Sequence, residues 1–342
     1  MLRACHGQQV FGKGVLVAPL IWRKREDLLS RIDYISVRWA WPAANPPAVM
    51  CSGVHFLWGV SLKAKNLIFA FLVLFFATLT SQAQMVVSSN LEYVEDSDYP
   101  LTSNLLDVYM PEDANDVPVI LFFHWGALVG SDKSDGEVLG RRFSAMGYGV
   151  VSSNYRLSPE VSHPLHTQDA AAALAWVANN IDSYGGDPKN IHLVGHSSGG
   201  YLAALLTLDY SYLETLGVDR SIIKGTVLIS PFLYVEETAP DRIAQDDRAT
   251  SIWGVDPKAW LAASVTPHIG PGQENILVIY ADGDDDWRKN QNLRFASAMR
   301  AAGNENIRAV EVSDRTHRSI VFSILDEDDQ IGKLMSEFIE AN

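Results

Sequence analysis

Ser197 stands at the centre of a pattern that suits a nucleophilic serine. Residues 195–199 read G-H-S-S-G, after a mostly apolar run at 191–194 and before an Ala/Leu-rich run at 201–208. This order predicts a strand, a sharp turn and a helix, with the serine hydroxyl exposed at the turn. The glycines leave room for strained backbone at Ser197. The alternative is a glycine-rich helix start in which the serine only caps the helix.

His317 is the histidine that we expect to activate this serine. A serine hydroxyl is a poor nucleophile at neutral pH and needs a general base that is itself oriented by an acid. His317 lies in the polar loop 313–319, between the last predicted strand and a short helix. The other histidines occupy less suitable positions. His6 and His55 precede the predicted cleavage site, and His124 precedes the serine pattern. His163 and His166 flank a predicted helix start, and His192 lies in a predicted strand. His196 belongs to the serine pattern itself, and His268 lies in the predicted cap. The alternative is an ordinary histidine in a surface loop.

The acid is expected in the loop after the predicted strand 276–281, which carries four aspartates. The carboxyl ends of strands are where open α/β sheets keep their sites. Asp284 fits best, because it lies three residues past the strand and seven before Gln291, where a helix is predicted to begin. Asp282 lies too near the strand, and Asp286 stays an alternative. Such a cluster could also hold a cation, but one loop would supply every ligand, so no metal is predicted.

An oxyanion hole is the third requirement of serine catalysis. One donor is expected to be the backbone N–H of Ser198, the residue after the nucleophile. The second is expected from the loop after the predicted strand 117–124, at Gly126 and Ala127. Trp125 precedes this pair.

Strands and helices alternate along the remaining chain, which predicts an α/β fold with a mostly parallel sheet covered on both faces. The segment at about 231–272 lacks a strand and is too long for a simple connection. We therefore expect a small helical cap there. The predicted strands are 85–95, 105–110, 117–124, 148–154, the run from Ile191, 222–229, 276–281 and 308–312, and the predicted helices are 136–146, 168–181, 201–208, 291–302 and 331–341.

The N-terminal quarter indicates export. An apolar run at 67–79 follows Lys63 and Lys65 and precedes small residues, which predicts a secretory signal peptide over 62–83 with cleavage after Ala83. The run is shorter than the roughly 18 to 20 residues of a spanning helix, although an uncleaved anchor is the alternative. We expect a periplasmic or secreted protein.

Residues 1–61 precede this signal and show no sustained period. We interpret them as a mis-assigned or disordered extension, with initiation at Met50 or nearby, and expect the folded domain to comprise 84–342. Both cysteines, Cys5 and Cys51, lie before the cleavage site, so the mature domain would lack disulfides and thiol chemistry.

The predicted mature domain is strongly acidic. Nine of the 27 basic and three of the 41 acidic residues precede Gln84, which leaves 18 basic against 38 acidic residues. A surface of this charge repels nucleic acid and anionic membranes. Neither is therefore expected as a partner.

From about Leu105 to its end, the chain resembles α/β-hydrolase esterases of the hormone-sensitive-lipase-like and kynurenine-formamidase-like group. Three segments carry the resemblance: Y-R-L-S-P at 155–159, D-A-x-x-A-x-x-W at 169–176, and the glycine-rich block 185–200. Asp284 and His317 match the acid and histidine positions of that group. The resemblance implies hydrolysis of carboxylic esters with small or short acyl groups, with no cofactor.

The chain departs from this group at residues 124–127, which read H-W-G-A where the group has H-G-G-[GA]. Trp125 therefore replaces a glycine, and either the hole is reshaped or Gly126 supplies the N–H while Trp125 packs aside. Two alternatives stay open: an arylformamidase-like amidase, and a catalytically weak binding protein on the same fold. The small-molecule substrate is the only partner indicated. The cap aromatics Tyr234, Trp253 and Trp260 either wall the acyl pocket or simply pack.

Overall fold

The computed structural model describes residues 85–95, 99–100, 102–246, 248–273 and 275–342. The predicted extension 1–61, the predicted signal peptide 62–83 and both cysteines lie outside the described residues. Within the described part of the chain, no helix combines the length and hydropathy needed to cross a membrane.

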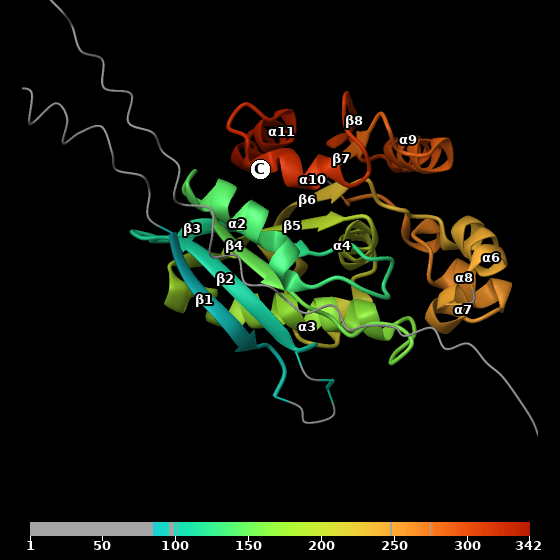
Figure 1. Ribbon diagram of the computed structural model, residues 1–342, viewed down its shortest axis with the longest axis horizontal. Helices are drawn as coiled ribbons and strands as arrows, with labels where there is room; N and C mark the ends of the chain where they lie inside the picture. Colours follow the sequence, from blue (N-terminus) through green and yellow to red (C-terminus); the bar gives the residue numbers. More distant parts are fainter. Residues whose placement is uncertain (1–84, 96–98, 101, 247, 274) are drawn as a thin grey trace, which may run out of the picture. The chain divides into compact units, whose positions relative to one another are not determined.

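One sheet organises the described residues (Figure 1). Its order is β1–β2–β4–β3–β5–β6–β7–β8. The first two strands pair antiparallel, β2 also pairs antiparallel with β4, and every later neighbour is parallel. The mostly parallel α/β sheet predicted from the sequence is therefore confirmed. The strands are β1 Met85–Glu92, β2 Leu105–Pro111, β3 Val117–Phe123, β4 Gly149–Ser153, β5 Gly186–His196, β6 Ile223–Ile229, β7 Ile276–Ala281 and β8 Ile307–Val312.

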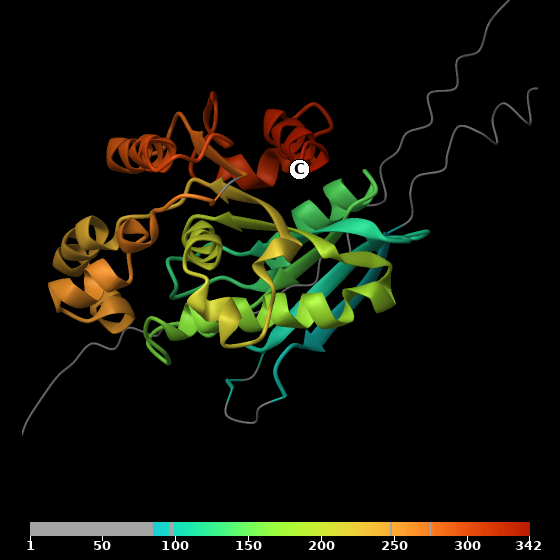
Figure 2. The ribbon, with the colours of Figure 1, turned by 180° about the vertical axis from the view of Figure 1, so that it is seen from behind.

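Helices cover both faces of this sheet, as Figures 1 and 2 show. Successive side chains of a strand point to opposite faces, so Leu121 and Phe123 of β3 join one core while Ile120 and Phe122 join the other. The first core is shared with α3, α4 and α9, and the second with α2, α10 and α11. The bounds of these helices are α2 Glu137–Ser144, α3 Leu165–Asn180, α4 Ser198–Leu208, α9 Asp286–Ala301, α10 Ser319–Phe322 and α11 Gln330–Glu340. A further short helix, α5, spans Ser211–Glu214.

Where the structure describes it, the segment between β6 and β7 holds helices and no strand. Its helices are α6 Val235–Gln245, α7 Arg248–Trp253 and α8 Pro257–Ala262, and α6 contacts both of the others. Both ribbon views place them together beside the end of the sheet from which α4 starts (Figures 1 and 2).

Several predicted boundaries are wrong, and the first strand, for example, ends at Glu92 instead of 95. Helix α3 begins at Leu165 instead of 168, and α9 begins at Asp286 instead of Gln291. The first turn of α9 carries polar and aromatic side chains without an apolar period, so hydrophobic spacing could not locate its start. Strand β5 begins at Gly186, five residues before the predicted start at Ile191 and directly after Gly185, whose φ is 91°.

Candidate active site

The chain turns sharply between β5 and α4, with Ser197 at the turn. Ser197 has φ 55° and ψ −112°, a strained conformation for a residue with a side chain, and its N–H donates to the Ile229 carbonyl at 2.8 Å. A Cβ on Gly199 would lie 2.0 Å from the Phe123 carbonyl oxygen. A Cβ on Gly195 would lie 2.1 Å from the Gly199 carbonyl oxygen. The two glycines of the pattern are therefore needed because backbone atoms occupy the space of their side chains.

Three side chains that are distant in the sequence form one hydrogen-bonded chain. His317 Nε2 lies 3.0 Å from Ser197 Oγ, and His317 Nδ1 lies 2.7 Å from Asp284 Oδ1. An ionised carboxylate can only accept, so Nδ1 carries the proton and Nε2 is free to accept one from the serine. The structure thus brings together the serine, the histidine and the preferred acid, in the arrangement of a nucleophile with its base and orienting group.

Asp284 is buried and held from several sides. Its second oxygen accepts hydrogen bonds from the Ser230 hydroxyl and from the Ala281 N–H, and Arg288 Nε lies 3.7 Å from Oδ1. Burial alone would raise the pKa of Asp284, but the hydrogen bonds from His317 and Ser230, with the charges of His317 and Arg288, hold it below its usual value. Asp284 is therefore ionised at neutral pH.

The other candidate aspartates do not contact His317. Asp286 is the first residue of α9, and its side chain is 92% exposed and pairs with Lys289 at 3.2 Å. Asp282 accepts hydrogen bonds from the N–H groups of Asp314 and Arg315, each at 3.0 Å. Asp282 therefore positions the loop that carries His317, a role that no sequence pattern indicated.

The expected oxyanion hole consists of backbone N–H groups in the turn after β3 and at the start of α4. Gly126, Ala127 and Leu128 have φ values of 115°, 57° and 64°, and the turn closes with a hydrogen bond from the Val129 N–H to the Gly126 carbonyl at 3.0 Å. Within the described part of the chain, no acceptor binds the N–H of Gly126, Ala127 or Ser198. These three donors, named from the sequence, are thus available for an oxyanion.

The peptide that precedes this turn is fixed by two ring side chains. Tyr155 donates its hydroxyl to the His124 carbonyl at 2.9 Å, and its ring stacks on His124 at 4.3 Å. His124 Nδ1 in turn bonds the Trp125 carbonyl at 2.7 Å. In a trans peptide the carbonyl and the next N–H point in opposite directions. Holding the Trp125 carbonyl on the His124 side therefore sets the direction of the Gly126 N–H.

The Trp125 indole packs to the side of this turn. Its ring lies 6.1 Å from the His196 ring, and the Arg318 guanidinium lies 5.4 Å from the indole centroid. The indole N–H is buried and has no partner in the described residues. This placement matches the alternative in which Gly126 supplies the N–H while Trp125 packs aside.

His196 makes a contact that the sequence did not indicate. Its ring is fully buried and lies 4.9 Å from the His317 ring. Burial, with a further contribution from His317, lowers the pKa of His196 to about 3. A neutral imidazole therefore packs against His317 and adds no charge beside it.

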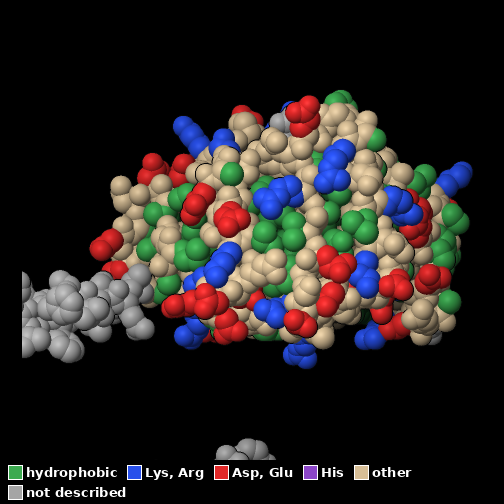
Figure 3. All heavy atoms as spheres, turned by 90° about the horizontal axis from the view of Figure 1, so that it is seen from above, with side chains coloured by type: hydrophobic (Ala, Val, Ile, Leu, Met, Phe, Trp, Pro, Cys, Tyr) green, Lys and Arg blue, Asp and Glu red, His purple; other side chains and the backbone are tan. Residues whose placement is uncertain are grey.

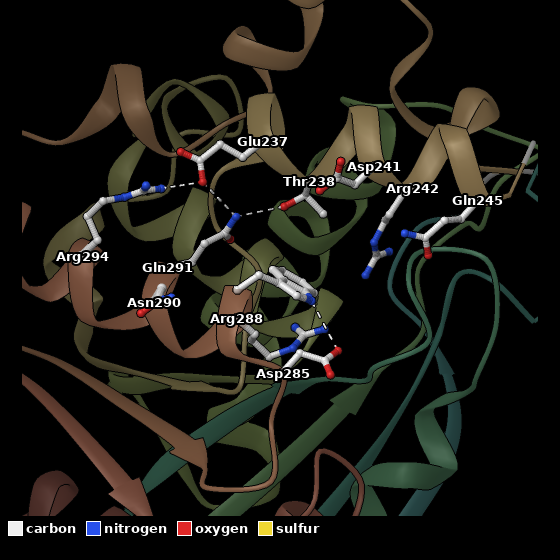
Figure 4. Close-up of a pocket in the computed structure, with 11 residues that line it drawn as sticks. Glu237, Thr238, Asp241, Arg242, Gln245, Asp285, Arg288, Asn290, Gln291 and Arg294 are labelled. Atoms are coloured by element: carbon white, nitrogen blue, oxygen red, sulfur yellow. Dashed lines mark hydrogen bonds and ion pairs between the residues drawn. The ribbon is translucent and has the colours of Figure 1, made fainter.

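The cap aromatics lie in packed surroundings. Trp253 meets the Phe232 ring edge-on at 5.6 Å, and Phe232 stacks on Tyr201 at 4.8 Å. Trp260 donates its indole N–H to the Gly254 carbonyl. A cavity of about 490 Å³ lies between α6 and the start of α9 (Figure 4), and Tyr234, Trp253 and Trp260 are not among the residues that line it. The structure shows packing contacts for Trp253 and Trp260, and a role of the three aromatics as walls of the acyl pocket stays a prediction.

Among the described residues, no group of three His, Cys, Asp or Glu side chains could hold a metal ion. The four aspartates of the β7 loop do not converge either, since Asp284 faces inward and Asp286 faces solvent.

Comparisons with known proteins point to esterases. The BD-FAE family model matches residues 106–226. A probable isoprenylcysteine alpha-carbonyl methylesterase of Oryza sativa subsp. japonica is 40% identical over 119 residues, which are 34% of this chain and 28% of that protein. Esterase LipC of Mycobacterium tuberculosis is 29% identical over 237 residues, 66% of this chain and 58% of the relative. The chain thus spans less than two thirds of these relatives.

Solved structures show the same fold. A truncated carbohydrate esterase from gut microbiota aligns with a TM-score of 0.63 and 22% identity, over 77% of this chain and 98% of its own. Esterase B of Lactobacillus rhamnosis aligns with a TM-score of 0.63 and 18% identity, over 82% and 94%. The α/β-hydrolase fold and the resemblance to esterases of this fold are confirmed.

Proposed function

We propose that this α/β-hydrolase is a serine carboxylesterase that acts on small or short-acyl esters. The observation that carries the proposal is the continuous chain from Asp284 through His317 to Ser197, with distances of 2.7 and 3.0 Å. The esterase relatives support the reaction class. The short acyl group follows from the resemblance to small-substrate esterases.

In the proposed mechanism, Ser197 Oγ attacks the ester carbonyl while its proton passes to His317 Nε2. Asp284 holds the histidine in the required tautomer and stabilises the imidazolium. The N–H groups of Gly126, Ala127 and Ser198 hold the oxyanion. The bond to the alcohol breaks, and the alcohol leaves with the proton from Nε2. Water then attacks the acyl-enzyme and gives a proton to Nε2. The bond between the acyl carbon and Ser197 Oγ breaks, the proton passes from Nε2 to Oγ, and the acid leaves.

Export to the periplasm or exterior is the second part of the proposal. It is supported by the apolar run at 67–79, the preceding lysines and the small residues before Gln84. Mass spectrometry of the N-terminus of the protein from the culture medium or periplasm would identify the cleavage point. A mature chain that retains residues 62–83 would contradict it.

Labelling with a fluorophosphonate tests the nucleophile. We expect one label on Ser197 and none on the Ser197→Ala variant, together with hydrolysis of p-nitrophenyl acetate by the unmodified protein. An unlabelled Ser197 in folded protein would instead indicate a binding protein. A higher kcat/KM for N-formylkynurenine than for p-nitrophenyl acetate would favour the arylformamidase alternative.

A further inference from the structure

The cavity between α6 and α9 has three guanidinium groups on its wall, those of Arg242, Arg288 and Arg294 (Figure 4). Arg242 projects from α6, and Arg288 comes from the first turn of α9. The volume of about 490 Å³ lies in the range of small-molecule sites. The cavity thus has the size and the donors of a binding site that the triad chemistry does not use.

The charge of Arg242 is unpaired within the described residues. Among the described residues, no carboxylate or carbonyl binds its guanidinium, and the contact that it makes is with the Phe232 ring, 5.0 Å from the centroid. Burial lowers the pKa of Arg242 from its usual value. A partly desolvated cation without a counterion is costly, and an anion in the cavity would offset this cost.

Arg288 is more deeply buried, with 6% of its surface exposed. It donates from Nη1 to the Ser230 carbonyl at 2.9 Å, and its guanidinium lies 4.5 Å from the Trp287 ring centroid. Burial lowers the pKa of Arg288 to about 10, and the positive charge of Arg242 acts in the same direction. Both groups are therefore charged at neutral pH, and they repel each other.

Arg288 has a counterion in Asp284, whose Oδ1 lies 3.7 Å from its Nε. In the described part of the chain, none of the acidic residues that line the cavity pairs with Arg242. Glu237 is bound by Arg294 at 2.7 Å, on the opposite side of the cavity in Figure 4. Asp285 is exposed and accepts from the Trp287 indole N–H at 3.3 Å, and Asp241 is exposed. On the face seen in Figure 3, acidic and basic side chains are interspersed. A preference for one charge would therefore arise locally, at Arg242 and Arg288.

The cavity adjoins the candidate active site through Arg288. This residue contacts Asp284 and Ser230, Asp284 bonds His317, and His317 bonds Ser197. We propose that the cavity binds a free carboxylate of the ester substrate between Arg242 and Arg288, so that the enzyme prefers esters that carry a second, unesterified carboxyl group. This inference rests on the proposed esterase function.

Matched pairs of esters test the inference. One pair places the carboxylate on the acyl side, p-nitrophenyl hemiglutarate against p-nitrophenyl valerate. The other places it on the alcohol side, 4-acetoxybenzoate against 4-acetoxybenzamide. We expect the unmodified protein to give a higher kcat/KM for the anionic member of at least one pair, although the protein is acidic overall.

The variants Arg242→Gln and Arg294→Gln remove the same charge from the same cavity. Hydrogen bonds to charged groups are stronger than those between neutral groups, so we expect the anionic-to-neutral ratio to fall at least about tenfold in Arg242→Gln. The ratio should stay within about twofold in Arg294→Gln, because Arg294 is already paired. Thermal unfolding of both variants checks that they are folded.

The outcomes separate this inference from the esterase proposal. If neither member of either pair is hydrolysed, the proposed function is wrong. If both members are hydrolysed with no anionic preference, or with one that Arg242→Gln leaves unchanged, the carboxylate site is wrong and the esterase stands. If free glutarate inhibits hydrolysis of the valerate ester and no anionic ester is preferred, the cavity binds free anions and the substrate proposal is overturned.

Discussion

The two sides of Ser197 are built in different ways. On one side, the side chains of His317 and Asp284 lie in loops after β8 and β7 and meet through direct hydrogen bonds. On the other side, Gly126 and Ala127 belong to one tight turn after β3, and their backbone N–H groups have no acceptor among the described residues. The function of the first side depends on the identity of the side chains. The function of the second depends on the orientation of the peptide planes, which decides where the N–H groups point.

This difference decides what each side tolerates. A side-chain triad fails when a functional group changes, even if the backbone is unaltered. A hole made of backbone N–H groups depends little on side-chain identity, but it fails when a peptide rotates. We therefore expect conservative substitutions to be severe on the triad side, and substitutions that force φ to be severe on the turn side.

The largest effect is expected from Asp284→Asn. The amide cannot hold the required histidine tautomer, so kcat should fall about 10³–10⁴-fold with little change in fold. Asp286→Asn is the matched control, and its exposed side chain should alter kcat by less than about twofold. The pair is measured by steady-state kinetics on p-nitrophenyl acetate. Loss of activity only in the Asp286 variant would make Asp286 the acid.

An intermediate effect is expected from Gly126→Ala. The added Cβ would lie 2.0 Å from the Gly130 carbonyl oxygen at a φ of 115°, so the peptide must move and the donor with it. Loss of one oxyanion donor costs about 10²–10³-fold in kcat. Gly130→Ala changes the same turn but meets nothing within 4 Å, and should retain most activity. Equal activity of both variants and the unmodified protein would place the hole elsewhere.

The smallest effect concerns His196, which packs against the base of one side and near Trp125 of the other. Burial lowers its pKa to about 3, so below pH 6.5 the unfolded chain binds a proton that the folded chain does not. Above pH 6.5, the titration of His196 does not change the free energy of unfolding. As the pH is lowered below 6.5, the free energy of unfolding decreases by up to about 1.4 kcal/mol per pH unit.

Denaturant unfolding between pH 7 and 4 measures this slope. His196→Gln should give a shallower fall in the free energy of unfolding than the unmodified protein, whatever its stability at pH 7. Identical slopes would mean that His196 is protonated in the folded state.

The sequence was most informative where local pattern and local structure coincide. The run from Ile191 to Leu208 predicted strand, turn and helix, because backbone crowding at Gly195 and Gly199 demands glycine within a few residues of Ser197. Asp284 was preferred for its position in the loop, although the helix start used in that argument was five residues too late.

What could not be predicted depends on contacts between distant segments. Nothing near Arg242 indicates that Arg288 faces the same cavity, because that proximity arises from the packing of α6 beside α9. In the sequence, His196 is likewise only the variable residue before Ser197 in the serine pattern. Its contact with His317 becomes visible only when β5 and β8 are placed in one sheet.

The hydrogen bonds of Asp282 have a consequence for engineering. Its carboxylate binds the N–H groups of Asp314 and Arg315, and the Gly283 N–H returns a bond to the Arg315 carbonyl at 3.0 Å. The loop with the acid and the loop with the base are thus fastened to each other. Loop exchange with another hydrolase would therefore have to transfer 282–286 and 313–317 together. Either loop transferred alone would lose the hydrogen bonds that hold it to the other loop.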